Sequence, residues 1–85
     1  MTRMGVVGYG YWGPNLARAI AEVDAMSLRA IADLSPQALE RASRRHPSTE
    51  LLTDWRDLVA DPAIDAVVIA TPASTHFEIA LAALR

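Results

Sequence analysis

The sequence contains no cysteine and no lysine, and each absence limits the chemistry available to the protein. Without cysteine, disulfides and thiolate metal sites are excluded, and nothing in the sequence argues for secretion. Without lysine, all eight basic residues are arginines. A reaction that needs a lysine to transfer a proton therefore has no candidate residue in this chain.

Long apolar runs are also missing. No stretch approaches the roughly 20 apolar residues of a membrane span, and the start, Met1 to Gly5, lacks the apolar run of a signal peptide. The net charge is -2 and the acidic and basic residues are interspersed, unlike the basic surface of a nucleic-acid-binding protein. We therefore expect a soluble cytoplasmic protein that binds neither membranes nor nucleic acid.

Apolar residues are abundant, at 52% of the 85 residues, which is enough to build the packed core of one small domain. Short apolar segments predict strands at 3–8, 27–32, 51–53 and 66–70. Helices are predicted at 14–22, from Pro36 to a break at His46, at 55–60, and after a cap at Ser74 or Thr75. This alternation predicts an α/β fold over residues 1–85, with a parallel sheet in the order 3-2-1-4. It corresponds to part of a doubly wound Rossmann domain, with the fifth and sixth strands in the absent C-terminal part.

A glycine-rich turn, residues 8–13 (GYGYWG), follows the first predicted strand and opens the first predicted helix. Its spacing suits a pyrophosphate, because Gly8 permits the tight turn, Gly10 leaves room for the phosphates and Gly13 lets the helix approach the sheet. The free N–H groups at the start of the helix then face the phosphates. The alternative is a strand-to-helix turn without a ligand, and the acidic residue that closes the next strand argues against it.

That acidic residue is Asp33, about 20 positions after Gly13. Its carboxylate suits the 2′- and 3′-hydroxyls of an adenosine ribose and would repel a 2′-phosphate. Leu34 and Ser35 follow, so no basic residue stands beside Asp33 to accept such a phosphate. The sequence therefore predicts NAD rather than NADP. In the alternative interpretation Asp33 only helps to cap the next helix, a role for which Ser35 is already suited.

Four aspartates late in the sequence resemble a metal cluster, but their positions around a predicted helix and turn fit capping and solvation better. They are Asp54, Asp57, Asp61 and Asp65. We therefore predict no metal site. His46 is expected in a surface loop, and Trp55 in the core or in a smaller satellite of it.

Two stretches carry a resemblance to a known family. Residues 8–18, GYGYWGPNLAR, resemble the first strand-to-helix turn of the Gfo/Idh/MocA oxidoreductases, and most closely the "GYWGPN" members associated with nucleotide-sugar and related sugar oxidation. Residues 70–76, ATPASTH, resemble the "TPxxxH" segment that follows the fourth strand in the same family, and residues 65–69 before it also fit. The resemblance extends over essentially the whole chain.

The resemblance implies an NAD(P)-dependent dehydrogenase of sugars, inositols or related polyols, in which a further C-terminal domain supplies much of the substrate pocket. It places Asp33 at the adenosine ribose and Thr71, Pro72 and His76 along the nicotinamide side of the crevice. The residues that it assigns to the pyrophosphate are Gly8, Gly10, Tyr11, Trp12 and Gly13. Many members have asparagine where this chain has Ala73, so any side-chain contact from that position is lost.

Several of these side chains have a second interpretation. Tyr11 and Trp12 either flank the cofactor or anchor the first helix by packing. Asn15 and Arg18 either reach toward the cofactor or are solvated. His76 either exchanges protons with a substrate or is a neutral histidine held by local hydrogen bonds.

The family's catalytic lysine lies in a Glu-Lys-Pro motif at the end of the fifth strand, and a histidine that often partners it lies in the following domain. This chain contains neither, so we predict no catalytic residue, no activity of the 85-residue chain alone, and a sugar-like substrate only together with the missing part. The alternatives are a non-catalytic dinucleotide-binding or regulatory module and a methyltransferase, against which the helix start and the TPxxxH segment argue. Because the sheet ends beside its fourth strand, we expect weak NAD binding and self-association through the uncovered edge.

Overall fold

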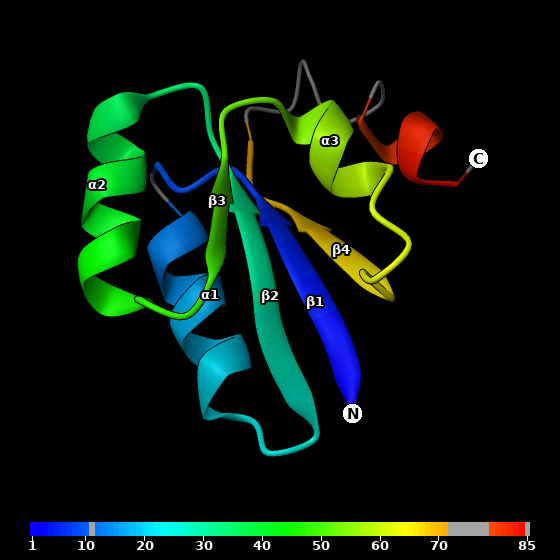
Figure 1. Ribbon diagram of the computed structural model, residues 1–85, viewed down its shortest axis with the longest axis horizontal. Helices are drawn as coiled ribbons and strands as arrows, with labels where there is room; N and C mark the ends of the chain where they lie inside the picture. Colours follow the sequence, from blue (N-terminus) through cyan, green and yellow to red (C-terminus); the bar gives the residue numbers. More distant parts are fainter. Residues whose placement is uncertain (11, 72–78, 85) are drawn as a thin grey trace.

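In the computed structural model, the chain forms a four-stranded parallel sheet flanked by helices (Figure 1). The structure describes residues 1–10, 12–71 and 79–84. The strands are β1 (Thr2–Val7), β2 (Met26–Ala32), β3 (Glu50–Leu52) and β4 (Ala66–Ile69). The helices are α1 (Gly13–Glu22), α2 (Pro36–Arg45) and α3 (Trp55–Val59), and residues 79–83 are also helical.

The strands lie in the order β3-β2-β1-β4, which confirms the predicted α/β fold and strand order. The predicted strands and helices between residues 2 and 69 are all present, with each predicted boundary displaced by no more than about one residue. The predicted cap of the last helix, at Ser74 or Thr75, lies outside the described residues. Within the described part of the chain, no helix has the length and apolar character needed to cross a membrane.

Helices cover both faces of the sheet. Successive side chains of a strand point to opposite faces, so each strand contributes residues to both layers of the core. In β1, Met4 and Val6 pack on the face covered by α1 and α2, where Ile31 of β2 joins them. Val7, the next residue of β1, packs on the other face, against Leu58 of α3 and other apolar side chains. Figure 1 shows this arrangement of three layers, with the sheet between two groups of helices. The apolar runs that end β1 and β2 are therefore buried on both sides, as expected for a parallel sheet, whereas that of β4 is half-buried.

Side chains at their N-terminal ends fix the starts of α2 and α3. Ser35 Oγ accepts a hydrogen bond from the N–H of Ala38 at 3.2 Å, and Pro36 occupies the first turn of α2. Asp54 Oδ1 accepts a hydrogen bond from the N–H of Arg56 at 2.9 Å. These contacts satisfy N–H groups that have no partner within their own helix, and they confirm the caps expected from the sequence.

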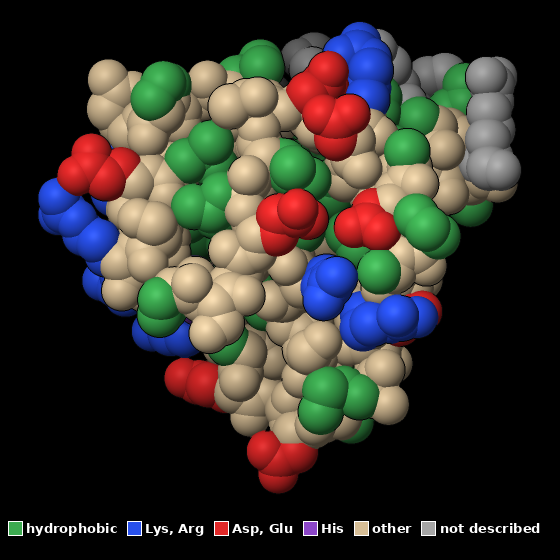
Figure 2. Space-filling view, in the orientation of Figure 1, with side chains coloured by type: hydrophobic (Ala, Val, Ile, Leu, Met, Phe, Trp, Pro, Cys, Tyr) green, Lys and Arg blue, Asp and Glu red, His purple; other side chains and the backbone are tan. Residues whose placement is uncertain are grey.

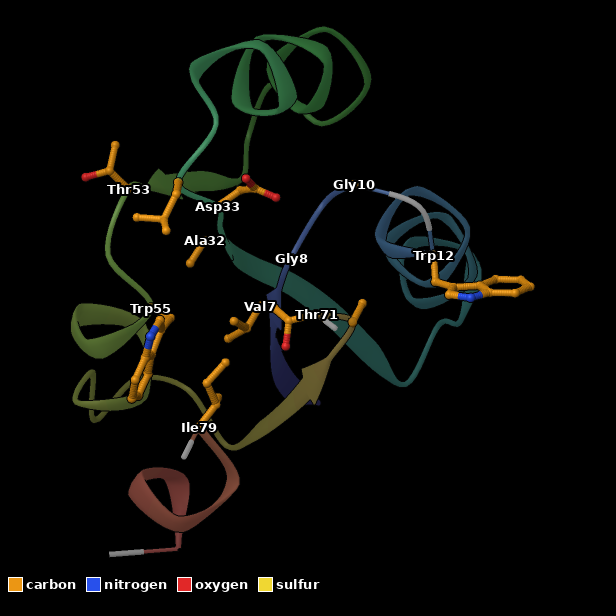
Figure 3. Close-up of a pocket in the computed structure, with 12 residues that line it drawn as sticks. Val7, Gly8, Gly10, Trp12, Ala32, Asp33, Thr53, Trp55, Thr71 and Ile79 are labelled. Carbon is orange, nitrogen blue, oxygen red and sulfur yellow. The ribbon is translucent and has the colours of Figure 1, made fainter. Parts of the chain in front are cut away.

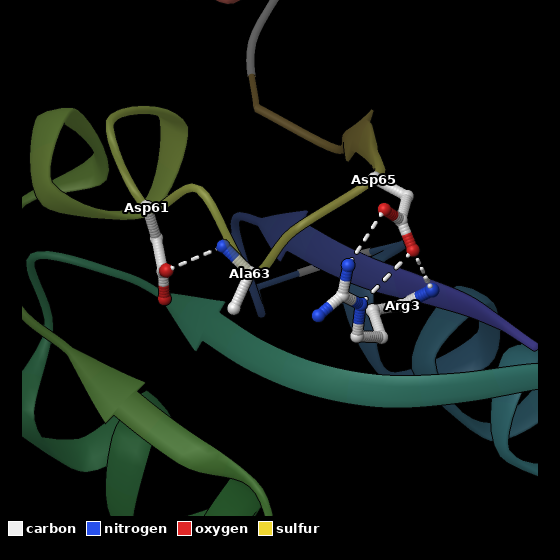
Figure 4. Close-up of polar contacts among 4 residues, drawn as sticks. All are labelled: Arg3, Asp61, Ala63 and Asp65. Atoms are coloured by element: carbon white, nitrogen blue, oxygen red, sulfur yellow. Dashed lines mark hydrogen bonds and ion pairs between the residues drawn. The ribbon is translucent and has the colours of Figure 1, made fainter.

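An ion pair between Arg3 and Asp65 joins the starts of β1 and β4 (Figure 4). The guanidinium donates from Nε and Nη2 to both carboxylate oxygens, each at 3.1 Å, and the backbone N–H of Arg3 adds a bond at 2.7 Å. Hydrogen bonds from Arg3 lower the pKa of the Asp65 carboxyl. Asp61 instead accepts a bond from the N–H of Ala63 in the preceding turn. Among the described residues no cluster of metal-binding side chains forms.

The position of His46 differs from the expectation of a surface loop. It follows the last residue of α2, and its N–H donates to the carbonyl of Ala42. Its imidazole is half-buried and meets the ring of Tyr9 edge to face, with centroids 6.3 Å apart. Burial, together with the charge of Arg45, lowers the pKa of His46. The sequence prediction missed this contact because Tyr9 lies far away along the chain.

Candidate functional site

A cleft of about 500 Å³ opens where the carboxyl ends of the strands meet (Figure 3). In a doubly wound sheet, ligands bind at this end, where the strand order reverses between β1 and β4. The cleft is built from the ends of all four strands together with the starts of α1 and α3 and the helical segment 79–83. Its lining residues are Val7, Gly8, Gly10, Trp12, Ala32, Asp33, Leu34, Thr53, Trp55, Ala70, Thr71 and Ile79.

The three glycines of the turn are not equivalent. Gly8 has a φ of +99°, which only glycine adopts without strain, and a Cβ there would lie 2.9 Å from the carbonyl oxygen of Ala70. A Cβ on Gly13 would collide with the carbonyl oxygen of Gly8, so Gly13 allows α1 to begin close to β1. A Cβ on Gly10 would meet nothing within 4 Å. The fold itself therefore requires glycine at positions 8 and 13, whereas at position 10 the structure leaves open space.

The start of α1 differs from those of α2 and α3. Its N-cap residue, Trp12, makes no side-chain hydrogen bond to the helix, whereas Ser35 and Asp54 cap the other two helices. As in α2, no acidic residue stands in its first turn. N–H groups of the first turn lack acceptors within their own helix, and the positive end of the helix dipole lies there. This end of α1 borders the cleft beside Gly10. The arrangement suits an anion, which would supply the acceptors that a capping side chain supplies elsewhere.

Asp33 lies at the end of β2 and is held by two backbone N–H groups. Its Oδ2 accepts a hydrogen bond from Tyr9 at 2.7 Å, and its Oδ1 accepts one from Ser35 at 2.8 Å. The first bond links the end of β2 to the glycine turn, and the second shapes the turn that precedes α2. A carboxylate offers about four lone-pair directions, so both oxygens remain able to accept a bond from a ribose hydroxyl. Ser35 caps α2 itself, so Asp33 does more than cap that helix.

The remaining predicted site residues fall into three groups. Thr71 lines the cleft just beyond β4. Trp12 is 60% exposed, and Figure 3 shows its indole on the far side of the opening from Trp55, pointing away from the other lining residues. It therefore forms part of the rim. Tyr11, Pro72 and His76 lie outside the described residues.

The sequence prediction missed one wall of the cleft. Thr53 and Trp55 lie on the side of Asp33 away from α1 (Figure 3). Leu34, which is 83% exposed, also lines the cleft. The sequence predicted Trp55 in the core or a satellite of it, and its half-buried ring does pack against a core cluster. The ring also lines the cleft and carries the guanidinium of Arg56 at 4.7 Å from its centroid. No local pattern marks these residues, because they meet only when β3 pairs with β2.

A family model matches residues 2–85 of the chain. It describes the oxidoreductase family Gfo/Idh/MocA and its NAD-binding Rossmann fold. The match agrees with the family resemblance of the two motifs, with the predicted fold class and with the predicted cofactor.

Relatives include enzymes of sugar-like compounds. The chain is 32% identical over 90 residues to an inositol 2-dehydrogenase/D-chiro-inositol 3-dehydrogenase of Lactiplantibacillus plantarum, with 100% of this chain and 25% of that protein covered. It is 35% identical over 88 residues to a levoglucosan dehydrogenase of Pseudarthrobacter phenanthrenivorans, with 94% of this chain and 23% of that protein covered.

A similar solved structure is the scyllo-inositol dehydrogenase of Lactobacillus casei with bound NAD(H) and scyllo-inositol. Its TM-score is 0.90 at 30% identity, over 99% of this chain and 25% of that one. The chain thus spans about a quarter of the length of these relatives. The family match, the strand order and the similar backbone of the solved structure lead to one conclusion. The chain belongs to the Gfo/Idh/MocA oxidoreductase family and forms the first four strands of its NAD-binding Rossmann fold.

Proposed function

We propose that the cleft binds NAD across the glycine-rich turn, as the cofactor-binding part of an oxidoreductase that acts on a sugar-like substrate. The observation that carries the proposal is the open space at Gly10, in front of the start of α1, whose N-cap residue makes no side-chain hydrogen bond to the helix. Neither feature serves the packing of the protein, and both suit a bound pyrophosphate.

The residues present fit the cofactor along the length of the cleft. Gly8, Gly10 and Gly13, with the N–H groups at the start of α1, would hold the pyrophosphate. Asp33 would accept hydrogen bonds from the ribose hydroxyls, and its charge disfavours NADP because a 2′-phosphate would approach a carboxylate. Thr71, beyond β4, would border the nicotinamide end. When bound, NAD supplies the hydride-transfer chemistry, and the protein orients it.

The relatives are named for inositols and levoglucosan, so a polyhydroxylated ring is the substrate class that we propose for the protein. The chain contains no lysine, and the described residues place no base beside Thr71 at the end of the cleft that the nicotinamide would occupy. We therefore propose that these 85 residues hold the cofactor without catalysing its reduction. Conversion of NAD to NADH by this chain with an inositol, followed by absorbance, would overturn that part of the proposal.

Titration of the isotope-labelled chain with NAD, followed by nuclear magnetic resonance, tests the cofactor site directly. We expect amide shifts at the glycine turn, at residues 33–35 and at Thr71, with weak binding, on the order of a millimolar dissociation constant, or about −4 kcal/mol. NADP should bind more weakly than NAD. S-adenosylmethionine, the cofactor of the methyltransferase alternative, should not compete. Equal shifts with NAD and NADP, or shifts that miss both the glycine turn and Asp33, would refute the assignment.

A further inference from the structure

A second hollow, of about 270 Å³, lies between α1 and α2. It shares no lining residue with the cleft among the described part of the chain. Its residues are Tyr9, Pro14, Asn15, Arg18, Arg41 and Arg45, and we call it the arginine groove. Three of its six lining residues carry a positive charge, and no aspartate or glutamate is among them.

The three arginines of the groove differ from others in the protein. Arg3, Arg44 and Arg56 each pair with a carboxylate, those of Asp65, Glu40 and Asp54 respectively. Within the described residues, the arginines of the groove form no such ion pair and no side-chain hydrogen bond. Figure 2 shows basic side chains gathered along the outer edge of α2. The groove therefore gathers positive charges that no carboxylate of the described residues neutralises.

The spacing of these arginines brings them to one place. Arg41 and Arg45 are four residues apart on α2 and share a face, whereas Arg44 faces Glu40 elsewhere on the helix. Like charges at this spacing repel each other, which is unfavourable unless an anion lies between them. The position of Arg45 in the last turn of α2 is also explained by the helix dipole. No such explanation applies to Arg18, in the middle of α1, or to Arg41.

The groove also contains a buried polar side chain. Tyr9 is 1% exposed, and its hydroxyl has no hydrogen-bond partner in the described structure. Nε2 of His46, whose ring contacts that of Tyr9, is also buried without a hydrogen-bond partner in the described structure. Buried polar groups nearly always have a partner. Tyr9 lines the groove, so an unsatisfied buried hydroxyl belongs to one of its lining residues, and a second unsatisfied atom belongs to His46, whose ring contacts that of Tyr9.

The geometry points to the arginine groove as a binding site for a small oxyanion, a compound that bears phosphate or carboxylate groups. Guanidinium groups match such oxygens with paired N–H donors. The amide of Asn15 adds a donor at the side of α1. The inference is independent of the proposed cofactor role, because the groove and the cleft have different walls.

Titrations with inorganic phosphate and with citrate, at constant ionic strength, test the site and distinguish the two chemistries. In nuclear magnetic resonance spectra we expect the Nε–H signals of Arg18 and Arg41 and the side-chain amide of Asn15 to shift in a saturable way. Tighter binding of phosphate assigns a phosphate compound, and tighter binding of citrate assigns a carboxylate. The signals of Gly8 and Gly10, which line the cleft and not the groove, report separately on any anion that enters the cleft.

The double variant Arg18→Gln and Arg41→Gln should weaken binding in the groove at least tenfold, and NAD-induced shifts should remain. The control is Arg29→Gln, an exposed arginine of β2 outside the groove, which should leave binding unchanged. An equal loss in the control variant would mean a general charge effect and would overturn the proposal. So would linear shifts without saturation for both anions.

Discussion

Substitution of Gly10 by alanine tests whether this glycine is required for NAD binding, whereas Gly8 and Gly13 are required for folding. The added Cβ meets nothing within 4 Å, and φ at Gly10 is not positive, so the folded protein accepts alanine without strain. Alanine also restricts the unfolded chain, which should raise stability by about 0.4–1 kcal/mol. For a domain of this size each 1 kcal/mol corresponds to a rise in melting temperature of about 4–8 °C.

NAD binding should respond in the opposite direction, because the methyl group occupies the space that the pyrophosphate needs. We expect the affinity for NAD to fall at least tenfold, a loss of about 1.4 kcal/mol. Thermal unfolding and NAD titration of the same samples measure the two effects. A variant that is more stable and still binds NAD like the wild type would refute the placement of the pyrophosphate at Gly10.

Two other glycine variants serve as controls. Gly13→Ala forces a Cβ against the carbonyl oxygen of Gly8, which only backbone movement relieves, so we expect a loss of about 3 kcal/mol or more, or failure to fold. Gly5→Ala brings a Cβ to 2.7 Å from Cδ2 of Leu58, a side chain that can shift. It should cost about 1–3 kcal/mol and leave the affinity for NAD unchanged.

Further substitutions test the polar contacts and the sheet edge. Asp33→Asn should reduce the preference for NAD over NADP at least tenfold, or about 1.4 kcal/mol, whereas Asp61→Asn, which alters a similar turn outside the cleft, should leave it unchanged in parallel titrations. The Asp65 pair should stabilise the fold fully above the ordinary pKa of 3.8 and progressively less below it, because its folded pKa is lower; melting temperatures of wild type and Asp65→Asn should therefore converge in acid. The half-buried His46 has a pKa below 6.5, so acidification below that value should destabilise the wild type more than His46→Gln in the same measurement. Because β4 pairs with β1 alone in the described sheet, sedimentation should show self-association that increases with concentration; a monomer at every concentration would contradict this.

The sequence predicted the order of the elements because local chemistry determines them. Pro14 and Pro36 mark helix starts, Ser35 and Asp54 provide caps, and unbroken apolar runs form strands covered on both faces. The glycine spacing and the acidic residue after β2 located the cleft for the same reason, since each motif belongs to one strand-to-helix turn.

Contacts between distant segments were beyond sequence reasoning. Three such contacts are the bond from Tyr9 to Asp33, the edge-to-face contact of Tyr9 with His46 and the wall formed by Trp55. They depend on how elements distant in the sequence lie beside one another. The helical spacing of Arg41 and Arg45 was visible in the sequence, but their meeting with Arg18 depends on the packing of α1 against the sheet next to α2. Periodicity places a residue on a face of its own element and does not identify what lies opposite.

The bond between Asp33 and the N–H of Tyr9 has a consequence for changing the cofactor preference of this protein. A neutral or basic residue at position 33 would admit a 2′-phosphate, but most such residues also remove the acceptor that ties the glycine turn to β2. The choice of cofactor and the geometry of the glycine turn thus depend on the same side chain, Asp33. A successful redesign toward NADP should therefore keep a short side chain with an oxygen at position 33, such as serine or asparagine, and introduce the positive charge at a neighbouring position.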